Sequence, residues 1–206
     1  PMVVTGDPFR FLVVEQLAAI EILPTKILVE PESRNTAASV LAAATSLLES
    51  DPDCLMLVMP SDHVIAEPVR FHNAVIAAAP TARGDRLVTF GIYPTRPETG
   101  FGYLELAKGG KADADTPQPL ARFVEKPDLT AAQEMLESGR FLWNAGIFLF
   151  KPGALVEAFQ EYASETLRCV REAVQAAASD LSFTRLGSEP WARLENTSID
   201  YAIKEK

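Results

Sequence analysis

Six short polar clusters stand where apolar runs of this chain stop, and they hold the side chains that could do chemistry. Each combines acidic, basic, amide or glycine residues: Glu30–Thr36, Pro60–His63, Gly100–Tyr103, Glu125–Pro127, Trp143–Gly146 and Ser198–Tyr201. Open α/β sheets bind ligands beyond the carboxyl ends of their strands, so polar residues at strand ends are where a site is expected. The sequence therefore predicts a site for a polar ligand, assembled from segments that are far apart in the chain.

Two acidic residues, Asp62 and Asp200, belong to these clusters. Asp62 follows the most apolar run of the chain, so its carboxylate could face the crevice, where a hard oxygen ligand suits Mg²⁺ that bridges phosphate oxygens. An Asx turn or a helix cap explains the position of Asp62 equally well. The position of Asp200 alone is better explained by the helix dipole, which favours an acidic residue near a helix N-terminus.

Glu125 and Lys126 end an apolar run with opposite charges on successive residues. In a strand, successive side chains leave on opposite faces. Lys126 suits a phosphate as a point charge, and the two acceptor oxygens of Glu125 suit a sugar diol. An exposed pair of charges at a strand edge, before the turn that Pro127 begins, is the alternative, and the residues alone favour it slightly.

Glycine and amide residues form the remaining candidates for ligand contact. Gly100 and Gly102 would let a sugar hydroxyl approach the main chain closely, although a bulge or a turn explains them as well. Asn144 offers a donor and an acceptor to a pair of hydroxyls, or it caps a local turn.

A basic and two polar residues open a predicted helix: Arg34, Asn35 and Thr36. Main-chain N–H groups at this helix start, together with the guanidinium of Arg34, could meet a nucleotide base or ribose. The plainer alternative is that Asn35 acts as an N-cap.

Taken in order, the clusters resemble the motif series of the mannose-1-phosphate guanylyltransferases, also called GDP-mannose pyrophosphorylases. The resemblance runs from the first predicted strand to the last residue, with Phe101 where the family often has Tyr and Ala145 where Ser is frequent. The family's N-terminal Gly-rich signature and its region after the last motif have no counterpart here. We therefore expect a chain truncated at both ends, with little or no activity on its own.

The resemblance implies a reaction in which a phosphate oxygen of mannose 1-phosphate attacks the α-phosphorus of GTP and pyrophosphate departs. It implies Mg²⁺ held by Asp62 and Asp200, and catalytic roles for these two residues and Lys126. It assigns substrate contacts to Gly100, Gly102, Glu125, Lys126 and Asn144. Nucleotide contacts are expected for Arg34, Asn35 and Thr36 at the predicted helix start, and for Asp62.

The apolar runs predict the elements that must position these residues. Strands are expected over short continuous runs, the third and fourth of which are apolar on both faces, as buried parallel strands are: Met2–Val4, Ile27–Val29, Cys54–Met59, Leu87–Phe90, Phe101–Ala107, Leu120–Val124 and Ala145–Phe150. Helical periodicity is expected over the intervening segments: Phe9–Ile20, Thr36–Leu48, Phe71–Ala79, Leu129–Glu137, a broken Ala154–Ala178 and Ile199–Lys204. Asn35 or Thr36 is expected to cap the second helix, and Asp128 or Thr130 the fourth.

Alternating strands and helices predict an α/β fold with a doubly wound, mostly parallel sheet. The resemblance makes this a mixed, Rossmann-like nucleotidyltransferase sheet of the GT-A-like type. The chain has 206 residues and 48% apolar content, enough to bury a substantial core, so a single domain over residues 1–206 is expected.

The composition and net charge limit the binding partners and the cellular compartment expected for this chain. A net charge of -9 argues against the broad basic surface that nucleic acid or an anionic membrane requires, so neither is an expected partner. Cys54 and Cys169 form no CxxC pair, and the two histidines add too few ligands for a transition-metal centre. The chain shows no signal-peptide pattern, and no apolar run approaches the roughly 18 residues that span a bilayer. A cytoplasmic location is expected, and a homo-oligomer is left open.

Two alternatives to GDP-mannose synthesis stay open at this point. One is a nucleotidyltransferase for another hexose 1-phosphate or another nucleotide, because the orientation of one hydroxyl is decided by pocket geometry. The other is a noncatalytic module that binds nucleotide sugars and regulates a partner.

Overall fold

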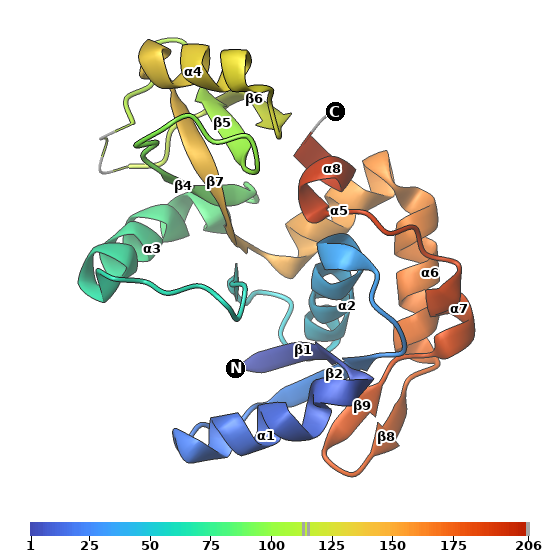
Figure 1. Cartoon of the computed structure of the whole chain (residues 1–206). Coiled ribbons are helices and arrows are strands. Elements are labelled where there is room, and N and C mark those ends of the chain that lie inside the picture. Colours follow the sequence, from blue (N-terminus) through green and yellow to red (C-terminus); the bar gives the residue numbers. More distant parts are fainter. Residues whose placement is uncertain (113, 115, 205–206) are drawn as a thin grey trace. The chain divides into compact units, whose positions relative to one another are not determined.

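The computed structural model describes residues 1–112, 114 and 116–204, and the chain divides into two compact units (Figure 1). Unit 1 contains residues 1–52 and 155–204, whereas unit 2 is the continuous segment 53–154. The polypeptide therefore leaves unit 1 once and returns to it once. The single domain expected over residues 1–206 stays a prediction.

Unit 1 contains a four-stranded mixed sheet in the order β1-β2-β9-β8. Its strands are β1 (Met2–Gly6), β2 (Lys26–Glu30), β9 (Phe183–Arg185) and β8 (Ala178–Asp180). The first two confirm strands expected from the sequence, and β2 pairs in parallel with both β1 and β9. The antiparallel β8–β9 pair was not predicted, because each of its strands has three residues and is too short to show a period.

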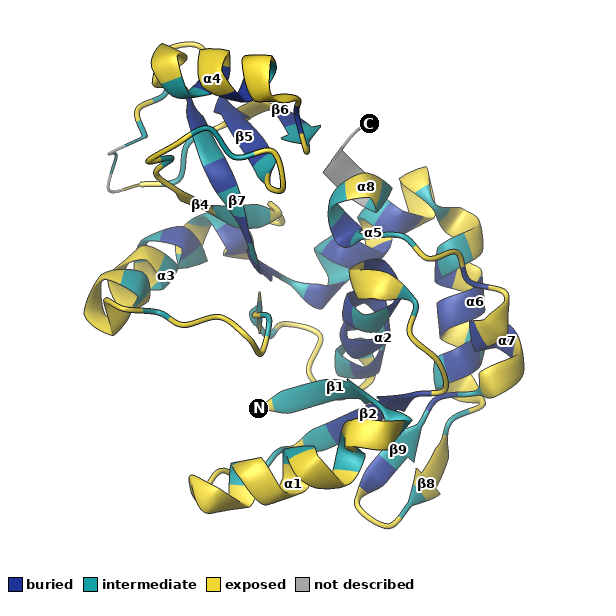
Figure 2. Cartoon of the chain, in the orientation of Figure 1, coloured by how far each residue is buried: buried dark blue, intermediate teal, exposed yellow. Residues whose placement is uncertain are grey.

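Helices complete unit 1, and most of them lie where helical periodicity was expected. Their bounds are η1 (Asp7–Phe9, a 3₁₀ turn), α1 (Arg10–Ala19), α2 (Asn35–Ser50), α5 (Pro152–Tyr162), α6 (Ser164–Gln175), α7 (Ser188–Ala192) and α8 (Ile199–Lys204). The break expected within 154–178 falls at Ala163, between α5 and α6. Small apolar side chains of α2 are buried along most of its length, whereas α1 is largely exposed (Figure 2).

Unit 2 contains a five-stranded antiparallel sheet around the ten-residue strand β7. Its strands are β3 (Met56–Val58), β4 (Val88–Ile92), β5 (Gly102–Leu106), β6 (Leu120–Glu125) and β7 (Phe141–Phe150). Two expectations are wrong here: the runs Cys54–Met59 and Leu87–Phe90 give antiparallel strands, each paired with β7. The expected burial on both faces is also not found, since Leu57 of β3 is exposed and no residue of β4 is buried. A continuous apolar run does not report the direction of the neighbouring strand.

The cluster Trp143–Gly146 also lies differently from the expectation. It was expected to precede a strand that begins at Ala145, but it lies inside β7, which begins at Phe141. Gly146 has a positive φ of 65°, and the pairing of β4 with β7 shifts register nearby, between Thr89 and Gly91. The polar and glycine residues thus mark a bulge within one long strand, which is a recurrent use of glycine in sheets.

Two helices cover the sheet of unit 2. Helix α3 (Pro68–Arg83) packs on β4 and β7, and it continues past Pro80, beyond its expected end at Ala79. Helix α4 (Leu129–Ser138) confirms its predicted cap, because the carboxylate of Asp128 accepts a hydrogen bond from Ala131 N.

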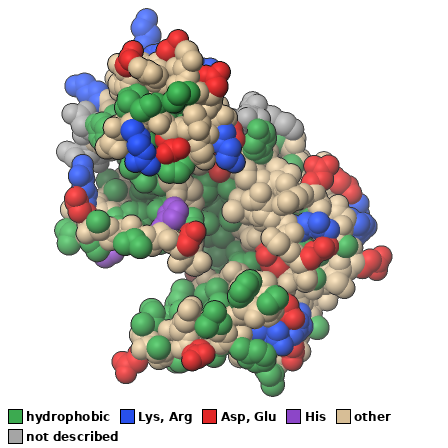
Figure 3. Space-filling model, in the orientation of Figure 1, with side chains coloured by type: hydrophobic (Ala, Val, Ile, Leu, Met, Phe, Trp, Pro, Cys, Tyr) green, Lys and Arg blue, Asp and Glu red, His purple; other side chains and the backbone are tan. Residues whose placement is uncertain are grey.

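Charge is distributed without strong segregation on the face drawn in Figure 3, where Lys and Arg side chains are interspersed with Asp and Glu. Cys54 and Cys169 are not joined by a disulfide. Over residues 1–112, 114 and 116–204, no helix combines the length and the apolar character that crossing a membrane requires.

Candidate functional site

The loop that enters β5 in unit 2 is held by a hydrogen-bond network centred on Glu98. The Tyr103 hydroxyl accepts a hydrogen bond from Glu98 N (2.9 Å) and donates one to Glu98 O (3.0 Å). The Glu98 carboxylate accepts from Gly100 N (3.3 Å) and from the guanidinium of Arg96 (3.1 Å). These two interactions lower the pKa of Glu98, the Gly100 bond most strongly. The Gly100 amide, considered above for a sugar hydroxyl, therefore already has an acceptor within the chain.

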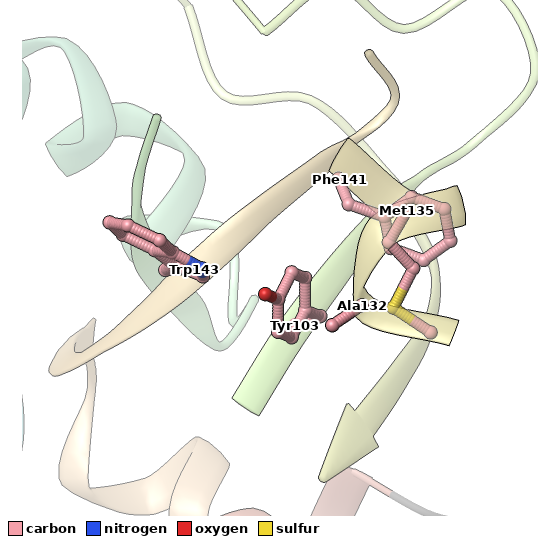
Figure 4. Close-up of a cluster of buried hydrophobic side chains, with 5 residues drawn as sticks. All are labelled: Tyr103, Ala132, Met135, Phe141 and Trp143. Carbon is pink, nitrogen blue, oxygen red and sulfur yellow. The ribbon is translucent and has the colours of Figure 1, made fainter. Parts of the chain in front are cut away.

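Aromatic side chains support the same loop. Tyr103 and Trp143 are paired across β5 and β7, and both belong to a buried cluster with Ala132, Met135 and Phe141 (Figure 4). In that view the hydroxyl of Tyr103 points toward Trp143. The Phe101 ring contacts the Trp143 ring edge to face at 5.3 Å, and the Arg96 guanidinium lies 5.5 Å from the same ring. The indole nitrogen of Trp143 is buried and has no hydrogen-bond partner among the described residues.

Gly102 and Glu125 are brought together because they are directly paired in the β5–β6 ladder. A Cβ at Gly102 would lie 2.6 Å from the Phe123 ring and 2.9 Å from Glu125 Oε2. A side chain at position 102 would therefore force Phe123 and Glu125 to shift.

Glu125 and Lys126 form an ion pair, with 3.0 Å between Lys126 Nζ and Glu125 Oε1. The expectation that these side chains leave on opposite faces is wrong, because β6 ends at Glu125 and Lys126 has a positive φ of 44°. Non-glycine residues with positive φ are strained and are enriched at functional sites. Lys126 N also donates to Phe101 O (3.2 Å), so the loop before β5 and the end of β6 form one cluster.

Asn144 organises the bulge in β7. Its Oδ1 accepts hydrogen bonds from the Thr89 hydroxyl (3.1 Å) and from Gly146 N (3.4 Å). Its amide oxygen thus has partners from β4 and β7. The same unit carries Asp62, which is exposed in a turn four residues beyond the end of β3.

In unit 1, the loop between β2 and α2 contacts the C-terminal segment. The guanidinium of Arg34 donates to Ala192 O (2.9 Å) and Trp191 O (3.4 Å) and pairs with the Glu32 carboxylate. The Trp191 indole N–H donates to Glu32 O (2.8 Å). Thr36 Oγ1 accepts a hydrogen bond from Ile199 N (3.0 Å).

The N-cap of α2 lies at least one residue before the position expected for it. Helix α2 begins at Asn35, which has a positive φ of 61°, so Arg34 occupies the N-cap position without a side-chain capping bond. Asn35 Oδ1 nevertheless accepts from Thr36 N (2.8 Å). Asn tolerates this left-handed conformation better than other non-glycine residues, which explains why the helix can begin there.

Asp200, the second carboxylate considered for a metal, lies in the first turn of α8 and is half-buried. It belongs to unit 1 and Asp62 to unit 2, so their pairing stays a prediction. Among the residues that the structure describes, no three or more His, Cys, Asp or Glu side chains are grouped to hold a metal ion. Mg²⁺ is commonly held by one or two carboxylates together with substrate phosphates and waters, and two aspartates fit that donor set.

The sequence analysis did not single out Arg96 and Glu98, which the structure places in the network that holds the loop before β5. Their signal was present as charges of opposite sign two residues apart, directly before Gly100. This charge pattern alone does not predict a role for either residue. Only the structure shows that the Tyr103 hydroxyl binds the main chain of Glu98.

A mixed sheet and an antiparallel sheet, both packed with helices, define an α/β protein. The chain matches the nucleotidyl transferase family over residues 1–192, and it belongs to that family.

Relatives of known name match along the whole chain. It is 42% identical over 206 residues to the xanthan biosynthesis protein XanB of Xanthomonas campestris pv. campestris (strain B100) and covers 43% of that protein. It is 39% identical over 209 residues to a mannose-1-phosphate guanylyltransferase of Escherichia coli (strain K12) and covers 44% of it. The chain thus spans less than half the length of these relatives.

Two solved structures have similar folds. A protein from Helicobacter pylori, described as mannose-6-phosphate isomerase, superimposes with a TM-score of 0.87 at 31% identity, covering all of this chain and 78% of that one. A protein from Thermus thermophilus, described as mannose-1-phosphate geranyltransferase, gives a TM-score of 0.74 at 23% identity, covering all of this chain and 70% of that one. The second likeness supports the fold alone.

Proposed function

We propose that this chain serves the transfer of a guanylyl group from GTP to mannose 1-phosphate, giving GDP-mannose and pyrophosphate. The observation that carries the proposal is the match along the whole of this chain, at 39% identity, to 44% of a protein named mannose-1-phosphate guanylyltransferase. Membership of the nucleotidyl transferase family supports the reaction class.

The proposed sugar-phosphate contacts lie in the unit 2 cluster formed by residues 96–103 and 125–126. Lys126 would bind the sugar phosphate, and its pair with Glu125 would hold both side chains at the end of β6 until the ligand arrives. Glu125 would accept from two sugar hydroxyls, with Gly102 directly paired to it across β5 and β6. Gly100 and Asn144 are the other residues proposed to contact the sugar. Because the Gly100 amide and the Asn144 oxygen already have partners, their role in our proposal is mainly to shape the loop and the bulge.

Asp62 and Asp200 would hold Mg²⁺, and the ion would supply neutralising charge for the phosphates of both substrates. The nucleotide contacts proposed for Arg34, Asn35 and Thr36 would come from donors that the loop between β2 and α2 does not already use. Asp62, an acceptor, would meet the nucleotide through the metal ion. Positioning of two polyanions and stabilisation of charge would account for the rate enhancement, so no protein nucleophile is required.

The compartment and the fate of the product belong to the same proposal. A cytoplasmic location agrees with cysteines, Cys54 and Cys169, that are not joined by a disulfide. The name of the xanthan biosynthesis relative favours use of the product in polysaccharide synthesis.

Calorimetric titration of GDP-mannose in the presence of Mg²⁺ tests the site. The wild-type chain is expected to bind, and Asp62→Asn, Asp200→Asn and Lys126→Ala are each expected to weaken binding by at least about tenfold, the loss of roughly one charge-assisted contact. Asp53→Asn and Lys108→Ala, exposed residues of unit 2, are the matched controls. Unchanged binding in all three site variants would overturn the assignment.

Nucleotide and sugar specificity are tested by calorimetric titration of GTP, UTP, dTTP and CTP, each with mannose 1-phosphate or glucose 1-phosphate, because the chain alone is expected to have little or no activity. The proposal expects GTP with mannose 1-phosphate to be preferred. The description of the Helicobacter pylori structure favours a second activity on a mannose phosphate, so conversion of mannose 6-phosphate to fructose 6-phosphate is measured in parallel.

A further inference from the structure

We propose that Thr36 and Arg34 are positioning residues for Asp200. In this inference they fix the segment that leads into α8, and thereby the place of the Asp200 carboxylate. The inference rests on the proposed function, in which Asp200 is a metal ligand. It gives two residues first considered for nucleotide contact a defined task within unit 1.

Thr36 contacts the residue directly before Asp200. Its Oγ1 accepts a hydrogen bond from the main-chain N–H of Ile199, at 3.0 Å, and the Ile199 side chain is buried with 1% exposed. The next residue of α2, Ala37, donates its N–H to Thr197 O at 3.1 Å. Two hydrogen bonds from the first turn of α2 therefore hold Thr197 and Ile199, on either side of Ser198.

Arg34 holds the same segment a few residues earlier. Its guanidinium donates to the carbonyls of Trp191 and Ala192, which end helix α7. Carbonyls at a helix C-terminus have no partner within the helix, and a positive charge is favourable there. The Trp191 side chain is fully buried and donates to Glu32 O at 2.8 Å, so the loop before α2 both donates to this segment and accepts from it.

Helix α8 depends on this support because it is short. It has six residues, and isolated helices of that length are not stable in water. Its packing partner in unit 1 is α2, beside which it lies in Figure 1. The direction in which α8 starts, and with it the position of Asp200 in its first turn, is therefore set by the contacts of Thr36 and Ala37.

A residue can orient a metal-binding side chain without touching the metal, and replacing it then changes the affinity for the metal. Replacing such outer partners typically weakens metal binding by about 10- to 100-fold. We therefore expect Thr36→Val to weaken metal binding at Asp200, and Thr36→Ser, which keeps the acceptor oxygen, to restore it. Arg34→Lys keeps the charge but cannot span two carbonyls, so it should weaken binding as well.

Helix α2 supplies a matched control. Thr45 lies on the same helix, and its hydroxyl oxygen is buried without a hydrogen-bond partner among the described residues. Thr45→Val makes the same chemical change as Thr36→Val without touching residues 191–200. A control for destabilisation is Gly139→Ala in unit 2, where φ is +65° and no atom lies within 4 Å of the added Cβ.

The test measures Mn²⁺ binding to the 206-residue chain by electron paramagnetic resonance, in the presence of GDP-mannose, since Mn²⁺ accepts the same oxygen ligands as Mg²⁺. Thr36→Val and Arg34→Lys are expected to raise the dissociation constant of Mn²⁺ about tenfold or more, whereas Thr36→Ser, Thr45→Val and Gly139→Ala stay near wild type. Amide hydrogen exchange at Ile199 and Asp200 is expected to accelerate in Thr36→Val and not in Thr45→Val.

The outcomes separate this inference from the proposed function. If Asp200→Asn abolishes Mn²⁺ binding but Thr36→Val and Arg34→Lys leave it unchanged, the positioning role is wrong and the metal site stands. If the wild-type chain binds no Mn²⁺ with GDP-mannose, the metal site is wrong and the inference falls with it. Unchanged exchange at Ile199 in Thr36→Val also overturns the inference, whatever the metal does.

Discussion

Glu30 is a carboxyl group buried at the end of β2, with 8% of the residue exposed. Burial raises its pKa above the ordinary value of 4.5, and a hydrogen bond donated by the Ser39 hydroxyl opposes that shift. A raised folded-state pKa means that the folded protein favours the neutral form. The contribution of Glu30 to the stability of the folded protein is therefore fully present below its unfolded-state pKa. This contribution is lost as the pH rises through the folded-state pKa.

We predict that Glu30→Gln gains stability relative to wild type as the pH rises. The amide stays neutral and can still accept from Ser39, so it avoids the cost of burying a charge. Urea midpoints measured between about pH 4 and pH 8 should show a difference between variant and wild type that grows with pH. Glu49→Gln, an exposed change on α2, should show no such growth. A pH-independent difference for Glu30→Gln would contradict the prediction.

At the scale of elements, the close approach of β5 and β6 depends on Gly102. A methyl group there would lie 2.6 Å from Phe123 and 2.9 Å from Glu125, so one of them must move. We predict that Gly102→Ala destabilises unit 2 by about 1–3 kcal/mol, as overpacking usually does. Under the proposed function it should also weaken GDP-mannose binding by displacing Glu125.

Gly100→Ala is the matched change for this prediction. Its Cβ would meet only Glu98 Oε1, at 3.6 Å, which is an ordinary contact. Its effect on stability should stay within about 0.5 kcal/mol. Urea unfolding of both variants checks the pair, and equal destabilisation by the two changes would show that the spacing between β5 and β6 is not the cause.

Local sequence predicted those elements whose signals are themselves local. Strands β1 and β2, the cap of α4 at Asp128 and the short helix α8 were predicted because period, capping chemistry and apolar runs all lie within a few residues. The direction of β3 and β4 could not be predicted, since it depends on their pairing with β7. The ion pair of Glu125 and Lys126 could not be predicted either, because it depends on the positive φ at Lys126, which the sequence does not reveal.

At the scale of the whole molecule, the two units differ in how the chain builds them. Unit 2 is one continuous segment with its own sheet and two covering helices, whereas unit 1 needs both 1–52 and 155–204. Asp62 lies in unit 2 and Asp200 in unit 1. Their proposed pairing at a metal ion came only through the resemblance, because no local pattern relates positions so far apart.

We predict that residues 53–154 fold when expressed alone, because their sheet pairs and the apolar contacts of α3 and α4 are internal. Residues 1–52 alone should stay unfolded, since β2 loses β9 and α2 loses α6. Dispersed amide resonances and a cooperative urea transition for 53–154 would agree with this prediction. A random-coil spectrum for that segment would contradict it.

The return of the polypeptide to unit 1 also bears on the order of events during synthesis on the ribosome. Strand β2 pairs with β9, and these partners are separated by the whole of unit 2. Domains generally fold as units during translation, the N-terminal ones first. Here β1 and β2 are synthesised first, but their sheet cannot be completed until β9 has been made. Unit 2 can fold before that point. Nascent chains that pause before residue 183 would therefore expose Ile27 and Val29, which makes this interval the one in which chaperones would be needed most.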